Sequence, residues 1–170
     1  MSELLGRPEY LHILVNPALT HALPVAALGL LAALVARSLP ATRLALVLVL
    51  LSAAAIWPAV FSGREGYDRV RSMADDTGAD WLAVHRHRAG DTAWVFYVVV
   101  AAAAAALLAP LRWPTAARPL AWLTLVAALA GCGVGAYIAY PAGKVRHREF
   151  RQAPPPDNEV RQARAEAGEN

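Results

Sequence analysis

The sequence has little charge and only one cysteine, and each of these features excludes several classes of protein. Of its 170 residues, 57% are hydrophobic and only 17% are charged, which is less charge than a soluble domain of this size carries. The single cysteine, Cys132, excludes an intrachain disulfide, a cysteine-ligated iron–sulfur cluster and haem attached through a CxxCH motif. No phosphate-binding glycine loop or hydrolase serine motif occurs either. We therefore expect a protein without catalytic activity of its own.

In place of these features, the sequence has four long apolar runs that contain no Asp, Glu, Lys or Arg. A helix needs about 20 apolar residues to cross the hydrocarbon core of a bilayer. The runs are residues 11–36, 44–61, 93–111 and 120–142. They predict an all-α integral membrane protein, a bundle of four transmembrane helices within residues 11–143. Without an acid in any run, a proton pump or cation-coupled transporter of the usual kind is not favoured.

The remaining residues form a lead, an insert and a tail. Residues 1–10 are a short polar lead. Residues 62–92, between the second and third runs, have an amphipathic pattern that predicts two short interfacial helices with a break at residues 75–78. Residues 144–170 form a basic, proline-containing tail without a core of its own. We expect this tail to be flexible in isolation, apart from one short helix near residues 158–167.

Two local features of the runs predict how the helices are shaped and packed. Pro17 and Pro24 should open or kink the first helix, because each removes a backbone N–H from it. In the fourth run, Gly131, Gly135 and Ala139 recur every four residues. Such a row of small residues allows close helix packing, within the bundle or against a partner subunit. The edge of a cofactor lying on this face is the alternative.

The distribution of Lys and Arg predicts the orientation in the membrane. With four transmembrane helices, the two termini and residues 62–92 share one side. All Lys and Arg residues lie on that side except Arg37, Arg43, Arg112 and Arg118. This excess predicts cytoplasmic termini. Basic residues beside membrane segments are topology signals, so the pI of about 9.4 does not indicate a nucleic-acid partner.

Polar and aromatic residues gather in one half of the predicted bundle, while the other half is almost entirely Ala, Leu and Val. Antiparallel helices bring together the start of the first run, the end of the second, the entry to the third and the end of the fourth. The residues gathered there are His12, Asn16, His21, Trp57, His85, His87, Trp94, Tyr97, Tyr137 and Tyr140. We expect any cofactor to bind in this half.

His21 is the histidine predicted to lie deepest in the membrane, about 14 Å along the helix from His12 at about 1.5 Å per residue. The two point about 180° apart, so one helix cannot aim both at the same site. His21 could ligate the iron of haem b with a second histidine, hydrogen-bond a quinone carbonyl, or bond a freed backbone group of a neighbouring helix. His85 and His87 could join it only if the insert dips into the bundle. Otherwise they lie on a solvated basic face.

The segment Asn16-Pro-Ala-Leu-Thr-His21-Ala-Leu-Pro24-Val-Ala resembles the opening of a bacterial four-helix membrane family of unknown function, the domain of unknown function numbered 2231. Its members begin with His-Pro, two residues and Val-His-Phe-Pro. The likeness extends to Gly63, to a histidine before the third run (His85 or His87), and to Gly131-Cys-Gly-Val-Gly135 in the fourth.

The resemblance implies that His21 is the second histidine of the family and that Pro24 is its proline, displaced by one position. Asn16 stands where the first family histidine would be, so a metal ligand at that position would be missing from this chain. The resemblance also implies a multi-pass protein of the bacterial cytoplasmic (inner) membrane in an electron-transfer setting.

These observations favour an integral membrane subunit of a larger respiratory or photosynthetic electron-transfer assembly, mainly structural in role. Its partners would be membrane lipid and other membrane-protein subunits. At the His21 end it would contact haem b or a quinone, with His21 as the candidate ligand of the haem iron and His85 and His87 as further cofactor-binding candidates. The alternatives are a self-standing cytochrome-b-like haem protein and a small channel or transporter.

Overall fold

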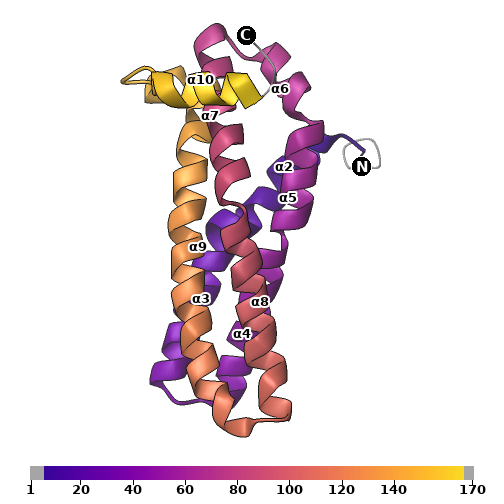
Figure 1. Ribbon diagram of the computed structural model, residues 1–170, viewed down its shortest axis with the longest axis vertical. Helices are drawn as coiled ribbons and strands as arrows, with labels where there is room; N and C mark the ends of the chain where they lie inside the picture. The colour runs from indigo at the N-terminus through magenta and orange to yellow at the C-terminus, as the bar shows by residue number, and fades with distance from the viewer. Residues whose placement is uncertain (1–5, 167–170) are drawn as a thin grey trace.

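In the computed structural model, residues 6–166 are described, and they are helical with no strand among them (Figure 1). Four helical stretches are long and apolar enough to cross a membrane: Pro8–Val35, Leu39–Glu65, Asp76–Leu111 and Pro114–Arg146. The prediction of an all-α chain with four such helices is therefore confirmed.

The first stretch is divided where its prolines lie. Helix α2 (Pro8–Pro17) is followed by a π-helical turn, η1 (Ala18–Ala22), and then by α3 (Leu23–Val35). Pro17 and Pro24 flank this turn, and neither can donate a backbone hydrogen bond to the preceding turn. The opening expected from the two prolines is thus a widened turn, which allows the helix to continue in a new direction.

The second stretch is divided in a similar way. Helix α4 (Leu39–Ala54) and helix α5 (Ile56–Glu65) meet at Ala55. Pro58 lies one turn later and cannot donate to the carbonyl of Ala54, so the regular ladder is interrupted here. As a result, α2 and α5 pack together as one pair of helices, while α3 and α4 pack together as another (Figure 1).

The third stretch extends much further than the apolar run that predicted it. Helix α6 (Tyr67–Met73) is separate, and Asp75 caps α7 (Asp76–Thr92) by accepting a hydrogen bond from the backbone N–H of Gly78 at 2.9 Å. Only Ala93 separates α7 from α8 (Trp94–Leu108), which ends in the 3-10 turn η2 (Ala109–Leu111).

The structure therefore differs from the expected insert. The break lies at residues 74 and 75 rather than at 75–78, since residues 76–78 already belong to α7, and the second predicted helix is a direct extension of the third long helix. The polar sequence of α7 hides this continuity, because charged residues can continue a helix as well as apolar ones do.

The fourth stretch contains α9, the longest single helix of the described chain. After the 3-10 turn η3 (Pro114–Ala116), α9 runs over Ala117–Arg146, and Pro141 lies inside it. A short turn, η4 (Arg148–Phe150), and an irregular segment then lead to α10 (Asp157–Glu166). The last helix lies across one end of the molecule, over α7 (Figure 1).

The apolar core lies between α3, α4, α8 and α9. Helix α8 packs against α4 and α9, and α3 packs against the same two helices. The largest fully buried apolar side chains here are those of Leu23, Leu30, Val49, Phe96 and Val99. Apolar side chains also cover the outside of these helices, where Leu28, Val35, Leu51 and Val126 are more than half exposed. A helix that is apolar all round is suited to a lipid environment.

The row of small residues in α9 packs inside the molecule. A Cβ added at Gly131 would lie 3.3 Å from Val99 Cγ2 and 3.4 Å from Leu23 Cδ2, and one at Gly135 would lie 3.7 Å from the carbonyl oxygen of Leu19. Both glycines are buried, and Ala139 is half-buried. Of the alternatives open from the sequence, the structure favours packing within the four helices.

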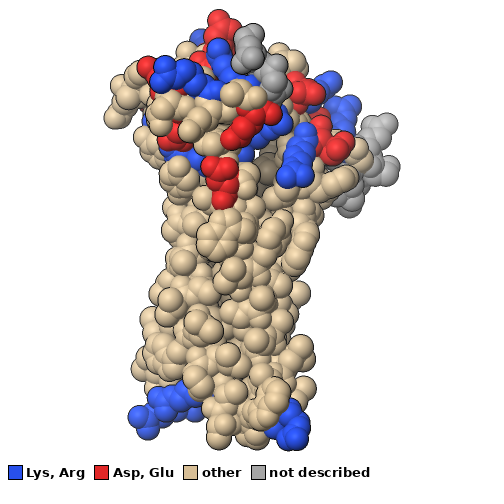
Figure 2. Space-filling view, in the orientation of Figure 1, with Lys and Arg blue, Asp and Glu red and all other residues tan. Residues whose placement is uncertain are grey.

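The charges are confined to the two ends of the molecule, and a wide uncharged belt separates them (Figure 2). One end carries only basic residues. The other end, called the head here, is made of the start of α2, the end of α5, α6, α7, the last turns of α9, η4 and α10, and it carries both signs. The stretch Asp76–Leu111 has 36 residues, or roughly 54 Å of helix, against about 30 Å of hydrocarbon. The surplus length lies at the head.

Candidate functional site

His12 lies in α2 and faces the neighbouring helix α5. Its Nδ1 atom is 2.9 Å from the carbonyl oxygen of Ala59. The ring lies against Gly63, where an added Cβ would be 3.1 Å from both Cε1 and Nδ1 of the imidazole. Glycine at position 63 therefore leaves room for the ring, and a larger residue there would displace it.

His85 lies in α7 and, like His12, bonds to a main-chain carbonyl of a neighbouring helix. Its Nδ1 atom is 2.9 Å from the carbonyl oxygen of Ile138 in α9. The side chain is half-buried and lies midway along α7. The sequence pattern placed residue 85 outside the membrane segments. Because α7 continues almost directly into α8, this residue nevertheless contacts the other helices.

The rings of His12 and His85 lie next to each other in an edge-type contact between the two helix pairs. Their centroids are 6.2 Å apart and their planes are nearly perpendicular, at 82°. A carbonyl oxygen only accepts hydrogen bonds, so Nδ1 carries the proton in each ring, and in the neutral imidazole Nε2 keeps a free lone pair. Within residues 6–166, neither Nε2 atom has a hydrogen-bond partner. The site thus offers two nitrogen ligands whose orientation is held by the main chain.

His21 is not part of this pair. It lies in the π-turn η1 with an exposed side chain, and its Nδ1 atom is 2.8 Å from the hydroxyl of Thr20. The depth argument from the sequence placed His21 well inside the hydrocarbon, but depth along a helix does not decide which way a side chain points. The structure brings His85 together with His12, on the opposite face of the first helix.

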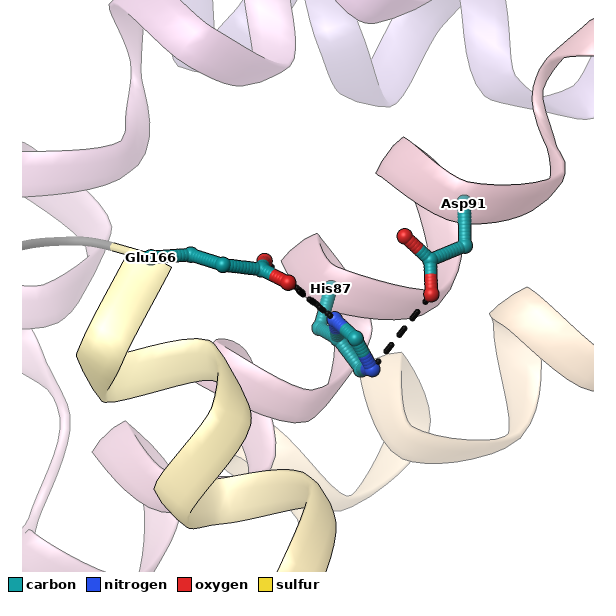
Figure 3. A group of neighbouring side chains, drawn as sticks. All are labelled: His87, Asp91 and Glu166. Carbon is teal, nitrogen blue, oxygen red and sulfur yellow. Dashed lines mark hydrogen bonds and ion pairs between the residues drawn. The ribbon is translucent and has the colours of Figure 1, made fainter.

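His87 is also separate from the pair, because two residues along a helix turn it to the other side. Figure 3 shows its ring between two carboxylates, Asp91 from the same helix and Glu166 from α10. Nε2 is 3.5 Å from Asp91, and Nδ1 is 3.1 Å from Glu166. Among the described residues, these three form the only group of three or more metal-ligating side chains within 4.8 Å. Since both ring nitrogens already meet a carboxylate, His87 links α10 to α7.

Further ion pairs fasten α10 to α7. Arg88 donates two hydrogen bonds to Glu159, from Nε at 2.7 Å and from Nη2 at 3.0 Å. The same guanidinium donates to the carbonyl oxygen of Tyr137. That oxygen has no backbone donor four residues later, because Pro141 lacks an N–H. The hydrogen bonds from Arg88 lower the pKa of Glu159. The tail that composition alone predicts to be flexible is therefore held in place, while its predicted short helix is present as α10.

A second ionic joint holds the segment that follows α9. Arg151 donates from Nη1 to both carboxylate oxygens of Asp75, at 2.8 and 2.9 Å, and Arg148 lies 3.0 Å from the same group. The hydrogen bonds from Arg151 are the main reason that the pKa of Asp75 falls to about 2. Asp75 thus joins the start of α7 to the end of α9.

Comparisons with protein-family models, with curated proteins and with solved structures found no match.

Sequence reasoning placed His12 and His85 in the same polar half but did not pair them. The signal that could have paired them is the helical pattern of residues 76–92, which continues into the third apolar run without a proline or a glycine pair to end it.

Proposed function

We propose that this protein is a four-helix integral membrane subunit that binds one haem b between His12 and His85 and takes part in electron transfer within a larger membrane assembly. The observation that carries the proposal is the adjacent pair of imidazoles, each with Nδ1 on a main-chain carbonyl and Nε2 free. This replaces His21 by His12 as the candidate ligand and keeps His85.

The donor set and the spacing support haem over a simple metal ion. A structural zinc ion takes four protein ligands, whereas an iron that already has four porphyrin nitrogens takes two. His12 and His85 supply two, and no third metal-ligating side chain within residues 6–166 joins them in a group. With metal–imidazole bonds of about 2.0 Å, two rings that share one ion have centroids roughly 6 Å apart. The centroids of His12 and His85 are 6.2 Å apart.

The surroundings of the pair also support this role. The two rings come from different helix pairs, α2–α5 and α7–α9, so a group bound between them would be held by both pairs. The remainder of the described chain forms no separate soluble domain. We propose that its four helices cross the membrane as one bundle, with α6 and α7 at the membrane surface, and that apolar side chains on the outside contact lipid and partner subunits.

An absorption spectrum tests the proposal directly. The full chain is expressed with a haem supply, purified in mild detergent and reduced with dithionite. We expect a Soret band and an α-band that are lost in His12→Ala and in His85→Ala. The matched controls His21→Ala and His87→Ala should keep both bands, because neither ring belongs to the pair. A featureless wild-type spectrum, or bands that survive His12→Ala, would rule out this site.

Copurification tests the assembly. We expect other membrane subunits to accompany the tagged chain from its native membrane in mild detergent. A chain that runs alone while keeping its haem bands would instead indicate a self-standing cytochrome-b-like protein.

A further inference from the structure

Lys144, near the end of α9, is a buried cation without a counter-ion. Its side chain is only 6% exposed. Its ammonium group donates to the hydroxyl of Tyr140 at 2.8 Å and lies 4.3 Å from the ring centroids of both Trp81 and Tyr140. No carboxylate of the described chain pairs with it. Buried charges are usually paired, so the aromatic contacts leave the charge of Lys144 only partly compensated.

A second observation at the same cluster also indicates a missing acceptor. The indole Nε1 of Trp81 is buried and has no hydrogen-bond partner in the described structure. Trp81 is the ring over which the ammonium of Lys144 lies. Two buried donors, one of them charged, therefore lie together without an anion, whereas buried polar groups in folded proteins are nearly always satisfied.

Lys144 also lines an open pocket of about 430 Å³ beside this cluster. The pocket lies in the head, where α9 ends and the chain turns through η4, and Lys144 comes two residues after the end of the fourth apolar run. Its walls are partly apolar and partly polar, and they consist of Tyr140, Gly143, Lys144, Glu149, Phe150, Gln152 and Ala153.

The charges around the pocket leave an excess of positive charge. Glu149 is the one carboxylate in the wall, and it is engaged by His147, whose Nδ1 atom is 2.8 Å from it. Arg148 and Arg151 are engaged by Asp75. Lys144 and the exposed Arg146 remain without an acidic partner among residues 6–166.

We propose that this pocket binds the phosphate group of an anionic phospholipid, with the ammonium of Lys144 as the donor. A basic pocket beside transmembrane helices at the membrane surface is suited to such a headgroup. The exposed rings of Tyr140 and Phe150 line the pocket, and the exposed ring of Tyr137 lies one turn before Tyr140 on α9, in the direction of the fourth apolar run, beside which acyl chains would lie. A free phosphate ion shares the headgroup chemistry but would gain nothing from these apolar walls.

Native mass spectrometry of the purified full chain tests the proposal, with phosphatidylglycerol or phosphatidylcholine added in detergent. We expect the wild type to retain phosphatidylglycerol in preference to phosphatidylcholine. Lys144→Gln should reduce this preference by roughly fivefold, the effect of one buried basic group near the surface. Arg146→Gln removes the same charge from an exposed position two residues away and should change the preference less than twofold. Lys144→Arg should retain the preference, because it keeps a cation in the pocket.

Thermal unfolding separates binding from a purely structural role of Lys144. Without lipid, Lys144→Gln should be about as stable as the wild type, since it removes a charge that lacks a counter-ion. With phosphatidylglycerol, only the wild type, Lys144→Arg and Arg146→Gln should gain stability. Equal retention of both lipids by the wild type, or an unchanged preference in Lys144→Gln, would overturn the proposal. Displacement of phosphatidylglycerol by millimolar inorganic phosphate would overturn the assignment to a lipid.

Discussion

At the scale of single residues, the polar half of the molecule is organised by side chains that bond to main-chain carbonyls of other helices. His12 bonds to Ala59, His85 to Ile138, and Arg88 to Tyr137. Each bond fixes the direction of a ring or a guanidinium across a helix interface. These bonds orient the imidazole pair, and they make the glycine that borders His12 a sensitive position.

If haem binds at the proposed site, we predict that Gly63→Ala weakens its binding without unfolding the protein. The new methyl group would lie 3.1 Å from Cε1 and Nδ1 of His12, so the ring has to move by a few tenths of an ångström. The haem content of the purified protein, measured by its absorption, should fall several-fold while the thermal midpoint changes little. Gly90→Ala is the matched control, because an added Cβ there meets nothing within 4 Å. Equal haem contents in both variants would contradict the role given to Gly63.

We predict that the Asp75 joint stabilises the head above about pH 4 and is lost in strong acid. The pKa of Asp75 is lowered to about 2 in the folded protein, against about 3.9 in an unfolded chain. The carboxylate is fully ionised in both states above the unfolded value, so the stabilisation is complete there. It declines as the pH falls from about 4 through about 2, where the folded carboxyl becomes protonated.

Thermal unfolding in detergent at several pH values measures this effect. At pH 6, Asp75→Asn should unfold a few degrees below the wild type, because asparagine still caps α7 but cannot pair with Arg151. The difference should shrink as the pH falls toward 2. Asp76→Asn, which alters the neighbouring exposed carboxylate, should match the wild type throughout. A difference that persists unchanged at pH 2 would show that the ion pair is not its cause.

At the scale of elements, the prolines and small residues decide where helices bend and how closely they approach. Pro17, Pro24 and Pro58 divide the first two stretches, and the divisions let α2 and α5 form their own pair at the head. Gly131 and Gly135 let α9 lie close to α3 and α8, next to the α2–α5 pair on the side away from the head. The polar half is therefore built from two helix pairs that rest on one close-packed apolar core.

We predict that Gly131→Leu destabilises the protein by about 1–3 kcal/mol, the usual cost of overpacking a core. The new side chain would meet Val99 and Leu23, which leave almost no room even for a Cβ. Gly133→Leu is the matched control on the same helix, since no atom lies within 4 Å of its added Cβ. The thermal midpoints in detergent should fall by several degrees for Gly131→Leu and stay near the wild-type value for Gly133→Leu. Equal midpoints would show that this face of α9 is not packed.

At the scale of the whole molecule, charge separates into a mixed head and a purely basic opposite end (Figure 2). The acidic residues of the described chain all lie at the head, and most of the basic ones do as well. The opposite end has only Arg37, Arg43, Arg112 and Arg118. The larger number of basic residues at the head favours a cytoplasmic head.

Labelling of single cysteines tests this orientation. In a Cys132→Ala background, Gln162→Cys places a thiol on α10, and Thr115→Cys places one in η3 at the opposite end; both side chains are exposed. Intact cells are treated with a maleimide that cannot cross this membrane but reaches its outer face. We expect the thiol of Thr115→Cys to react, and that of Gln162→Cys to react only after lysis. The reverse pattern would place the head outside.

Local pattern was sufficient for several features of this fold. The absence of charge from four runs predicts four apolar helices, because the length of a membrane crossing depends only on local composition. The small residues of α9 and the prolines of the first helix likewise act over one or two turns. The short helix of the tail was also predictable from its composition, but its position on α7 was not, since that depends on Arg88 and Glu159, which lie 71 positions apart.

The sequence by itself determined that this chain is suited to a membrane and which half of it carries the histidines. Only the tertiary structure decided that His12 meets His85, that His21 lies on the surface and that His87 holds the tail. The physical reason is that the direction of a side chain depends on the rotation of its helix and on whether that helix continues. At Ala93 the polar α7 continues into the apolar α8, and this brings residue 85 to the level of residue 12.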